Sequence, residues 1–477
     1  MERRELAGKV ERICEIMRAD GLYLLQYIEQ LSWLVFLKIF EDMEEEFRLE
    51  AELEGKPYHS IIDPKYSWSN WARKDMRAED LEKFIGQELL PYYRSLRGTK
   101  QKEMIASIFA EVRQHMRSPY ALKEVISMID GIDFTNPEDS HALSQIYEEL
   151  LMLMGKEGGA AGEYYTPRPI VRLMVKIVDP KIGETVFDPL CGSCGFLAEA
   201  FEHMKRKRSL TAEEERVLEE STFFGQELKF QPYLIGIMNC ILHGIFYPNV
   251  RRVDTFEENV ATTPAKRYSV ILTNPPFGGK IEKRLRGNLP VETGSTELAA
   301  LQFCMRKLEK DGRCGIVIPE GILFRGGAYA RVKKELLENF NVHTIISLPA
   351  GVFAYISPKG GTGPKANLLF FDRTGPTKEI WYYELQGEYT KAKPIKDEDL
   401  VDCFEKWKDR KTSENSWIVP VEEIVENGYD MSAKNPSRKK EVGYLEPEKI
   451  VAGILEKEKE ILKILGEFQE ILADKND

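Results

Sequence analysis

The sequence predicts an α/β protein: a doubly wound, Rossmann-like sheet with an all-helical N-terminal domain before it and a C-terminal long helix after it. Short apolar runs alternate with helical patterns between about residues 185 and 385, which is typical of strands wound with helices on both faces. The first 150 or so residues show helical periodicity instead, and so does the C-terminal end. We therefore divide the chain into four parts: a helical domain at 1–155, a sheet domain at 156–385, a C-terminal extension at 386–446 and a terminal interaction helix at 447–477.

The composition is that of a globular protein that does not bind DNA by charge alone. The 477 residues leave room for two or three domains, and the net charge is −11. A protein that binds DNA unaided usually carries a basic footprint, so any affinity for nucleic acid must be local or supplied by a partner. The seven cysteines are scattered and odd in number, and polar residues interrupt the longest apolar run, 22–40. We expect a cytoplasmic protein with no secretory signal and no membrane span.

The N-terminal region is predicted to be a helical scaffold or interaction domain. An apolar stripe at helical spacing extends from Leu24 to Phe40, and a charged helix continues it at 44–50. Trp68 and Trp71 lie in a loop that they are expected to anchor to the helices. No set of residues here has the spacing of metal ligands or of a nucleophile. Further helices are expected at 78–90, 102–116 and 139–154.

A glycine-rich stretch, 155–162, is expected to be a flexible joint that ends the helical domain. The next segment leads into an amphipathic helix at 170–178, and Thr166 is a candidate N-cap with Pro167 at the first helical position. A helix start explains the threonine and the proline but not the adjacent tyrosines and the arginine, which need another role. The full segment reads Glu163-Tyr164-Tyr165-Thr166-Pro167-Arg168-Pro169.

The first strand of the sheet is predicted at 185–188, where it ends at Asp188. A tight glycine turn follows, and then a helix at 197–207. This is the pattern of the first βα turn of a nucleotide-binding sheet, in which glycines let the backbone approach a ligand at the carboxyl ends of the strands. A purely structural turn is an equal alternative. Cys191 and Cys194 form a C-x-x-C, but no second pair or histidine follows at zinc spacing, so no metal is expected.

Two further acidic residues end the next two predicted strands. Glu227 closes the strand 221–227, and an acid in this place typically binds both ribose hydroxyls of an adenosyl ligand. A charged insert, 205–220, lengthens the spacing from Asp188. Asp254 ends a third short strand and could accept a hydrogen bond from an adenine amine. Each acid alone is more often a helix cap or a solvated turn residue, but together they line one edge of the sheet.

The fourth strand, 268–273, is apolar and β-branched, and it stops at Asn274-Pro275-Pro276-Phe277. Two successive prolines have fixed φ and no N–H, so this loop offers carbonyl acceptors on a stiff backbone. The Asn274 side chain adds an acceptor, and Phe277 can stack on a ring. Such a loop suits the binding of an exocyclic –NH2 group by both hydrogens, although a proline-stiffened turn is the simpler alternative. The basic, glycine-rich segment 278–288 is either a phosphate-contacting or a solvated loop.

The remaining pattern completes the sheet and ends in a helix. Strands are expected at 315–319, 343–348, 367–371 and 380–383, the last two closing the sheet, with helices at 296–308 and 330–339. The final helix, 447–472, carries a heptad stripe that only Glu458 interrupts, which indicates a helical partner. Packing of that stripe on the chain's own domain is the alternative. The stripe consists of Val451, Ile454, Ile461, Leu465, Phe468 and Leu472.

Taken in order, four motifs resemble those of amino-methylating DNA methyltransferases that use S-adenosylmethionine. They are Glu163–Pro169, Asp188–Phe196, Glu227 and Asn274–Phe277. With the helical N-terminal region and the terminal helix, nearly the whole chain is similar to the modification (HsdM) subunits of type I restriction–modification systems. The glycine turn departs from the commoner pattern at Cys194, where glycine or alanine is more usual.

The resemblance implies a site-specific DNA adenine methyltransferase of Rossmann-like methyltransferase fold. Its cofactor, S-adenosylmethionine, would contact Asp188 and the segments 163–168 and 193–195, with Glu227 on the ribose and Asp254 on the adenine. A flipped-out adenine would be bound through Asn274, Pro275, Pro276 and Phe277. The implied partners are DNA, a specificity subunit bound through the terminal helix and the N-terminal domain, and a restriction subunit, with two copies of this chain per complex. The alternatives are methylation of RNA or of a protein amide, and a non-catalytic subunit that binds the cofactor for assembly.

Overall fold

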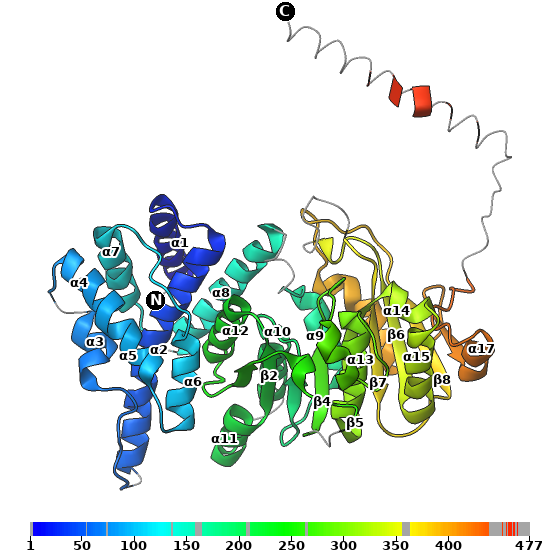
Figure 1. The fold of residues 1–477 in the computed structure, drawn as a ribbon, viewed down its shortest axis with the longest axis horizontal. Coiled ribbons are helices and arrows are strands. Elements are labelled where there is room, and N and C mark those ends of the chain that lie inside the picture. The colour runs from blue at the N-terminus through cyan, green and yellow to red at the C-terminus, as the bar shows by residue number, and fades with distance from the viewer. Residues whose placement is uncertain are drawn as a thin grey trace, which may run out of the picture. The chain divides into compact units, whose positions relative to one another are not determined.

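The computed structural model describes residues 3–437 except 54, 73–74, 135–136, 158–164, 207–209, 263–265 and 355–362, together with residues 451, 455, 457–459, 461–462 and 465. The chain forms two compact units, Met1–Ala433 and Lys434–Asp477. Figure 1 shows the first unit as a group of helices followed by a helix-flanked sheet.

The N-terminal region is helical, as predicted. Trp68 and Trp71 are buried, and the Trp68 indole donates to Asp130 Oδ1 at 2.9 Å, which confirms them as anchors. The loop predicted around them is wrong, because these two residues begin and end a short helix. The helix expected at 102–116 ends at Phe109, because the Arg94 guanidinium donates to the Phe109 carbonyl at 3.1 Å and to the Val112 carbonyl at 2.6 Å. The helices are α1 (Arg3–Ala19), α2 (Leu24–Leu53), α3 (Trp68–Trp71), α4 (Ala78–Phe84), α5 (Leu90–Ser95), α6 (Lys100–Phe109), α7 (Pro119–Asp130) and α8 (Pro137–Glu157).

The joint predicted from Gly155 onward is wrong at its start, because α8 continues through Gly155 to Glu157. One glycine costs a helix only about 1 kcal/mol relative to alanine, which does not end a long helix. The cap predicted at Thr166 is also wrong. Helix α9 (Arg168–Val178) has Pro167 at its N-cap with no side-chain cap hydrogen bond, so the Thr166 hydroxyl is available for another contact.

The sheet has nine strands in the part of the chain that the structure describes, in the order β3-β2-β1-β4-β5-β7-β6-β8-β9. The strands β1, β2, β3, β4 and β5 are mutually parallel, while β7 is antiparallel to both of its neighbours. The expectation that 367–371 closes the sheet is therefore wrong, since β7 lies between β5 and β6, and the unpredicted β9 forms the edge. The strands are β1 (Val186–Asp188), β2 (Phe223–Glu227), β3 (Asn249–Arg252), β4 (Tyr268–Thr273), β5 (Leu308–Pro319), β6 (Asn341–Leu348), β7 (Ala366–Asp372), β8 (Glu379–Glu384) and β9 (Ser416–Pro420).

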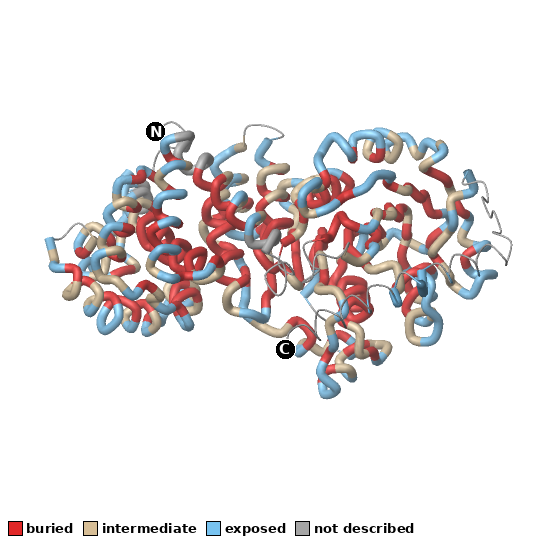
Figure 2. The backbone as a smooth tube through the Cα atoms, turned by 90° about the horizontal axis from the view of Figure 1, so that it is seen from above, coloured by how far each residue is buried: buried red, intermediate tan, exposed pale blue. Residues whose placement is uncertain are grey.

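Both faces of the sheet are buried under helices. Successive residues of one strand, such as Val270 and Ile271, enter different apolar clusters, because side chains alternate across a strand. Figure 2 shows buried residues along the interior segments of the chain and exposed residues along its outer turns. The covering helices of the sheet domain are α9, α10 (Gly195–Lys205), α11 (Ala212–Ser221), α12 (Phe230–Leu242), α13 (Thr296–Lys307), α14 (Glu320–Phe324) and α15 (Ala328–Asn339).

The helical region and the sheet share one apolar core. Helix α12 packs against α2 and α8, and the cluster on that face of the sheet continues into the N-terminal helices. Polar contacts also join the N-terminal helices to α12. Ser107 and Tyr233 share a hydrogen bond of 2.7 Å, and Gln231 donates to Glu29 at 3.3 Å. The N-terminal helices therefore support the sheet directly.

The C-terminal part contains short elements and the beginning of the predicted terminal helix. Helices α16 (Val401–Lys408) and α17 (Val421–Glu426) flank β9. Of the predicted stripe, Ile454, Phe468 and Leu472 lie outside the described residues, whereas Val451, Ile461 and Leu465 are described and exposed. In the portion of the chain that the structure describes, every helix is too short or too polar to cross a lipid bilayer.

Candidate active site

The carboxyl ends of the central strands converge where the strand order reverses. Strands β1 and β4 are neighbours at this point, and in open α/β sheets ligands bind at such a crevice. A cavity of about 390 Å³ lies there, a volume within the usual range for ligand sites. The predicted residues that line it are Thr166, Arg168, Asp188, Ser193, Gly195, Glu227, Asp254, Asn274 and Pro276.

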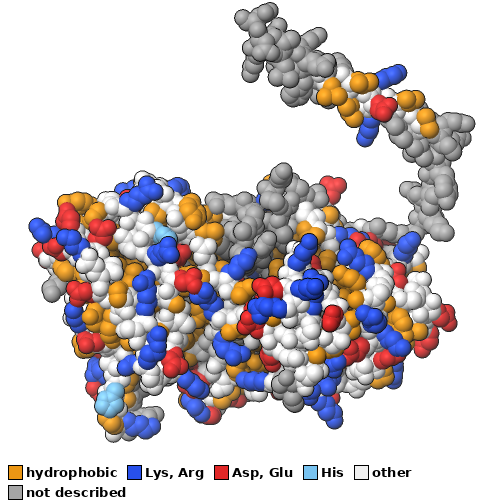
Figure 3. Space-filling view, viewed as in Figure 1, with side chains coloured by type: hydrophobic (Ala, Val, Ile, Leu, Met, Phe, Trp, Pro, Cys, Tyr) orange, Lys and Arg blue, Asp and Glu red, His pale blue; other side chains and the backbone are white. Residues whose placement is uncertain are grey.

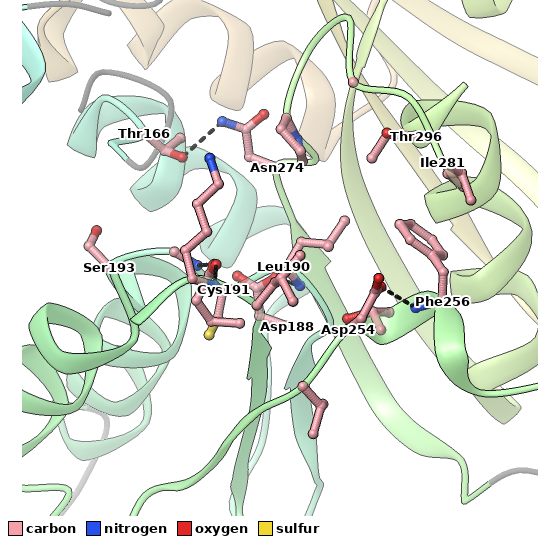
Figure 4. A pocket seen from close by; sticks show the side chains of 18 of the residues that line it. Thr166, Asp188, Leu190, Cys191, Ser193, Asp254, Phe256, Asn274, Ile281 and Thr296 are labelled. Atoms are coloured by element: carbon pink, nitrogen blue, oxygen red, sulfur yellow. Dashed lines mark hydrogen bonds between the residues drawn. The ribbon is translucent and has the colours of Figure 1, made fainter. Parts of the chain in front are cut away.

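Figure 4 shows how these residues are distributed around the cavity. Thr166 and Asn274 lie together at one end, Asp188 lies below them, and Asp254 lies beside Phe256 on the far side. The loop predicted to bind an amine and the residue predicted to bind a cofactor adenine thus lie on separate parts of the wall.

Asp188, the last residue of β1, is a buried carboxyl that ties two strands together. Its Oδ1 accepts from the Thr273 hydroxyl on β4 at 2.7 Å and from the Leu190 N–H at 3.1 Å. Burial raises the pKa of Asp188 to about 7, although both hydrogen bonds oppose the shift. Asp188 therefore holds the ends of β1 and β4 in register beneath the cavity.

Glu227, the last residue of β2, is buried against the glycine turn. One carboxylate oxygen accepts from the Gly192 N–H at 3.1 Å and the other from the Lys229 N–H at 2.8 Å. Burial raises the pKa of this carboxyl, and the backbone donors oppose the shift. Each oxygen accepts one backbone N–H bond and retains acceptor capacity, so the group can receive two hydroxyl donors from a bound ribose.

The glycine turn is shaped by two close contacts. Cys194 has a left-handed conformation at φ 56°, and its buried sulfur lies against Gly236, where a Cβ would come within 2.7 Å of it. Gly195 faces the Arg168 guanidinium so closely that any side chain there would collide with it. Both cysteines of the C-x-x-C are buried free thiols, and burial is the main cause that raises the pKa of Cys191 well above its ordinary value. These thiols are packing groups of the turn.

Asp254 follows β3 and caps a short 3-10 turn. Its Oδ1 accepts from the Phe256 N–H at 3.0 Å, as Figure 4 shows. Phe256 itself lines the cavity together with Ile281 and Leu285. The carboxylate therefore stands beside an apolar wall, which is the surrounding that a flat heterocycle requires.

The segment before α9 contributes to the cavity through its second half. Glu163 and Tyr164 lie outside the described residues, and Tyr165 is buried with the Arg168 guanidinium 5.9 Å from the centre of its ring. Arg168 forms a bidentate ion pair with Glu148 of α8. The helical region thus fixes one wall of the cavity through this arginine.

The loop after β4 presents an unsatisfied acceptor. Asn274 Nδ2 donates to Thr166 Oγ1 at 3.0 Å, and its buried Oδ1 has no hydrogen-bond partner among the residues that the structure describes. Pro275 is buried and Pro276 lines the cavity. Phe277 packs edge-to-face against Phe353 with ring centres 5.6 Å apart. The loop is therefore rigid, with a free carbonyl oxygen at its first residue.

Three supporting residues were not predicted from the sequence. Thr273 bonds Asp188, Glu148 bonds Arg168, and the Glu297 carboxylate accepts from the Gly278 N–H at 2.5 Å. Only Thr273 had a local signal, because it is the last strand residue before the proline pair. The other two are distant in sequence from the groups that they bind.

The sheet order and the cavity at its switch point define a nucleotide-binding α/β protein, and the family match makes it an S-adenosylmethionine-dependent methyltransferase. Residues 138–443 match the family model described as N-6 DNA Methylase, and residues 6–129 match the HsdM N-terminal domain. The chain is therefore a member of the N-6 DNA methylase family, whose members methylate adenine in DNA.

Full-length relatives narrow the assignment. The chain is 34% identical to the EcoEI methylase subunit of Escherichia coli over 98% of each chain, and 27% identical to the EcoKI methylase subunit of E. coli K12 over 84% of this chain and 75% of that one. It belongs to the methylase subunits of type I restriction enzymes. It is the adenine-specific modification subunit of a type I restriction–modification system.

Solved structures agree with this assignment. A chain from a structural study of the assembly and conformational transition of the type I system shares 45% identity and a TM-score of 0.84, with 99% of both chains covered. A modification subunit of a putative type I restriction enzyme from Vibrio vulnificus YJ016 shares 39% identity and a TM-score of 0.80, covering 91% of this chain and 97% of that one. The likeness includes both the helical region and the sheet.

Proposed function

We propose that Asn274 and the Pro275 carbonyl accept the two hydrogens of the amino group of a flipped-out adenine. The observation that carries this proposal is the buried Asn274 Oδ1, which lacks a donor among the described residues and stands beside the cavity. A buried acceptor without a partner is unfavourable, so this oxygen is best explained by a donor that arrives with the substrate. Phe277, packed on Phe353, offers a ring edge or face to the same base.

The cavity wall fits the adenosyl cofactor. Glu227 has acceptor capacity left for two ribose hydroxyls, and Asp254 stands beside the apolar residues Phe256, Ile281 and Leu285. The turn at Ser193–Gly195 and the segment Glu163–Arg168 complete the proposed contacts. Asp188, Tyr165 and Cys194 act here by holding the strand end, the arginine and the turn in place.

The chemistry then depends on placement. S-adenosylmethionine held by Glu227, Asp254 and the turn 193–195 would supply an activated methyl group to the amine nitrogen, which would lose its proton after the transfer. Asn274 and Pro275 hold both amine hydrogens, which directs the nitrogen lone pair away from the loop and into the cavity. Because orientation alone can supply much of such a barrier reduction, no strong base is required at this loop.

Replacement of Asn274 separates binding from chemistry. Asn274→Ala removes a contact made only to the target amine, so methyl transfer should fall by at least about a hundredfold while cofactor affinity stays within about threefold. Isothermal calorimetry on the chain measures affinity, and labelled methyl transfer in the complex with its specificity subunit measures turnover. Asn339→Ala, an exposed asparagine of α15, is the matched control. Parent-like transfer by Asn274→Ala would contradict the proposal.

We further propose that residues 447–477 bind the specificity subunit through a helix. The described apolar residues of this segment, Val451, Leu455, Ile461, Leu462 and Leu465, are 52–67% exposed, and such a stripe flanked by charge suits a helical partner. Figure 3 shows basic and acidic side chains interspersed over the face in view. Because this chain carries a net charge of −11, the partner would supply the specific reading of DNA. The proposed complex contains the specificity subunit, two copies of this chain and a restriction subunit.

Truncation tests this interface. A chain ending before Pro447 should still bind the cofactor but should no longer co-purify with the specificity subunit or methylate a specific site. The double variant Lys457→Ala/Lys459→Ala changes exposed charges on the same segment and should still assemble. A truncated chain that assembles and methylates like the parent would place the interface elsewhere, with the N-terminal helical domain the next candidate.

The cysteines support a reducing cytoplasmic location. All seven are free and buried, and none forms a disulfide.

A further inference from the structure

The orientation of the Asn274 amide is a question that the amine-binding role leaves open. A side-chain amide carries an acceptor at one end and donors at the other. When the amide oxygen points to the cavity, it can accept a hydrogen bond from the target amine. When the amide nitrogen points there instead, two donors face each other and no hydrogen bond forms. The orientation of this amide is set by one terminal torsion, which is broad and roughly two-fold in asparagine.

The rest of the loop is already fixed by contacts that leave this torsion free. The prolines set the backbone after Asn274, and on the far side the Glu297 carboxylate accepts from the Gly278 N–H at 2.5 Å and from the Ser295 hydroxyl at 2.7 Å. The Thr296 N–H donates to the Gly279 carbonyl at 3.2 Å. Backbone placement therefore does not depend on the asparagine side chain.

The Thr166 hydroxyl is the group that meets the amide. Asn274 Nδ2 donates to Thr166 Oγ1 at 3.0 Å, across 108 positions of sequence, and this bond leaves Oδ1 as the free end (Figure 4). Thr166 is itself held in place, because Tyr165 before it is buried and the Pro167 carbonyl after it accepts from the Ile170 and Val171 N–H groups at 3.0 and 3.2 Å.

We propose that Thr166 is a positioning residue that holds the Asn274 amide in its productive orientation: its hydroxyl accepts from Nδ2 while Oδ1 faces the target amine. This inference rests on the amine-binding role proposed for Asn274. It assigns Thr166 a role in the rate of transfer that is separate from the cofactor contact implied by its motif. It also explains the threonine two residues before α9, where its hydroxyl does not cap the helix.

Two substitutions of Thr166 test the proposal in the complex with the specificity subunit and its DNA site. Thr166→Val keeps the shape but removes the acceptor, so the single-turnover rate at saturating S-adenosylmethionine should fall by about ten- to a hundredfold. Thr166→Ser keeps the hydroxyl and should stay within about threefold of the parent. Thr166 also belongs to the segment proposed to contact the cofactor, so calorimetry should show that Thr166→Val weakens the cofactor Kd by clearly less than it lowers the rate at saturating cofactor.

Asn274→Asp provides a sharper control, because a carboxylate accepts at both oxygens and has no unproductive end. Thr166→Val should therefore lower the rate by less than about threefold in an Asn274→Asp background. An undiminished effect in that background would overturn the proposal, and so would a parent-like rate for Thr166→Val alone. A cofactor Kd weakened as much as the rate would instead place Thr166 on the cofactor and overturn it too.

The failure of this inference can be told from failure of the amine-binding role. If Asn274→Ala abolishes transfer while Thr166→Val transfers like the parent, only the positioning role is wrong. If Asn274→Ala itself transfers normally, the amine-binding role is wrong and the positioning role is wrong with it.

Discussion

The two sides of the active site use different kinds of polar group. On the cofactor side, the carboxyls of Asp188 and Glu227 are buried, and each already accepts hydrogen bonds from the protein's own backbone or hydroxyl groups. On the target side, the neutral amide of Asn274 uses only its nitrogen, and its oxygen has no donor among the described residues. The carboxyls of the first side already have donors in the free protein, whereas the Asn274 oxygen would receive its donor from the proposed target amine.

This difference predicts a division of labour. Groups that are satisfied in the free protein shape the pocket, so their removal should weaken binding or stability. A group that gains its partner only when the target amine enters should affect turnover instead, since interactions formed on the way to the transition state raise the rate. The titratable groups also lie on the cofactor side, while the amide of Asn274 does not titrate.

The largest effect expected on the cofactor side is a pH dependence of stability from Asp188. Its folded pKa of about 7 lies above the ordinary 3.8, so the folded protein holds a proton between about pH 4 and 7 that the unfolded chain releases. The stability from this group is present below about pH 4 and is lost as the pH rises to 7. Linkage converts the shift to about 4 kcal/mol at most.

Asp188→Asn isolates this contribution, because its amide oxygen can still accept from Thr273 and Leu190 but does not titrate. Urea unfolding at several pH values should show the variant gaining stability relative to the parent as the pH rises from 4.5 to 7.5. Parallel profiles for the two proteins would show that Asp188 ionises normally in the fold.

Glu227→Ala should weaken cofactor binding by about 1–3 kcal/mol, or roughly five- to 150-fold in Kd. The change leaves the Gly192 and Lys229 N–H groups without their acceptor and removes the proposed ribose contact. Calorimetry on the isolated chain measures the loss. Glu338→Ala, on the exposed face of α15, should bind like the parent. Unchanged affinity in Glu227→Ala would remove this residue from the cofactor site.

Cys194→Gly should have the smallest effect. Glycine relieves the left-handed conformation at φ 56° but loses the buried sulfur that packs on Gly236, so the free energy of unfolding should change by about 1 kcal/mol or less. Cofactor Kd should stay within about threefold, since the thiol is fully buried. Thermal unfolding and calorimetry check both points. A tenfold loss of cofactor affinity would show that the thiol contributes to the site.

The sequence predicted the elements that carry local signals. The strand before Asn274 has β-branched residues and a proline stop, and the turn after Asp188 has its glycines, so both were placed within a residue or two. The acids Asp188, Glu227 and Asp254 were correctly expected at one edge, because parallel strands end on the same side of a sheet.

What the sequence could not supply depends on tertiary contacts. Helix α12 is buried almost throughout and so lacks the periodic polar face that marks a helix. The place of β7 between β5 and β6 is a matter of strand order, which no local pattern encodes. Thr166 carries the signature of a helix cap, yet its hydroxyl binds a residue 108 positions away.

The central claim, that the two sides act separately, is tested most directly by a double-mutant cycle of Glu227→Ala and Asn274→Ala. Cofactor Kd and the single-turnover rate at saturating cofactor are measured for the parent, both single variants and the double variant. We predict that Glu227→Ala changes Kd alone, that Asn274→Ala changes the rate alone, and that the effects add within about 0.5 kcal/mol. A slow rate for Glu227→Ala at saturation, or lost cofactor binding in Asn274→Ala, would contradict the account.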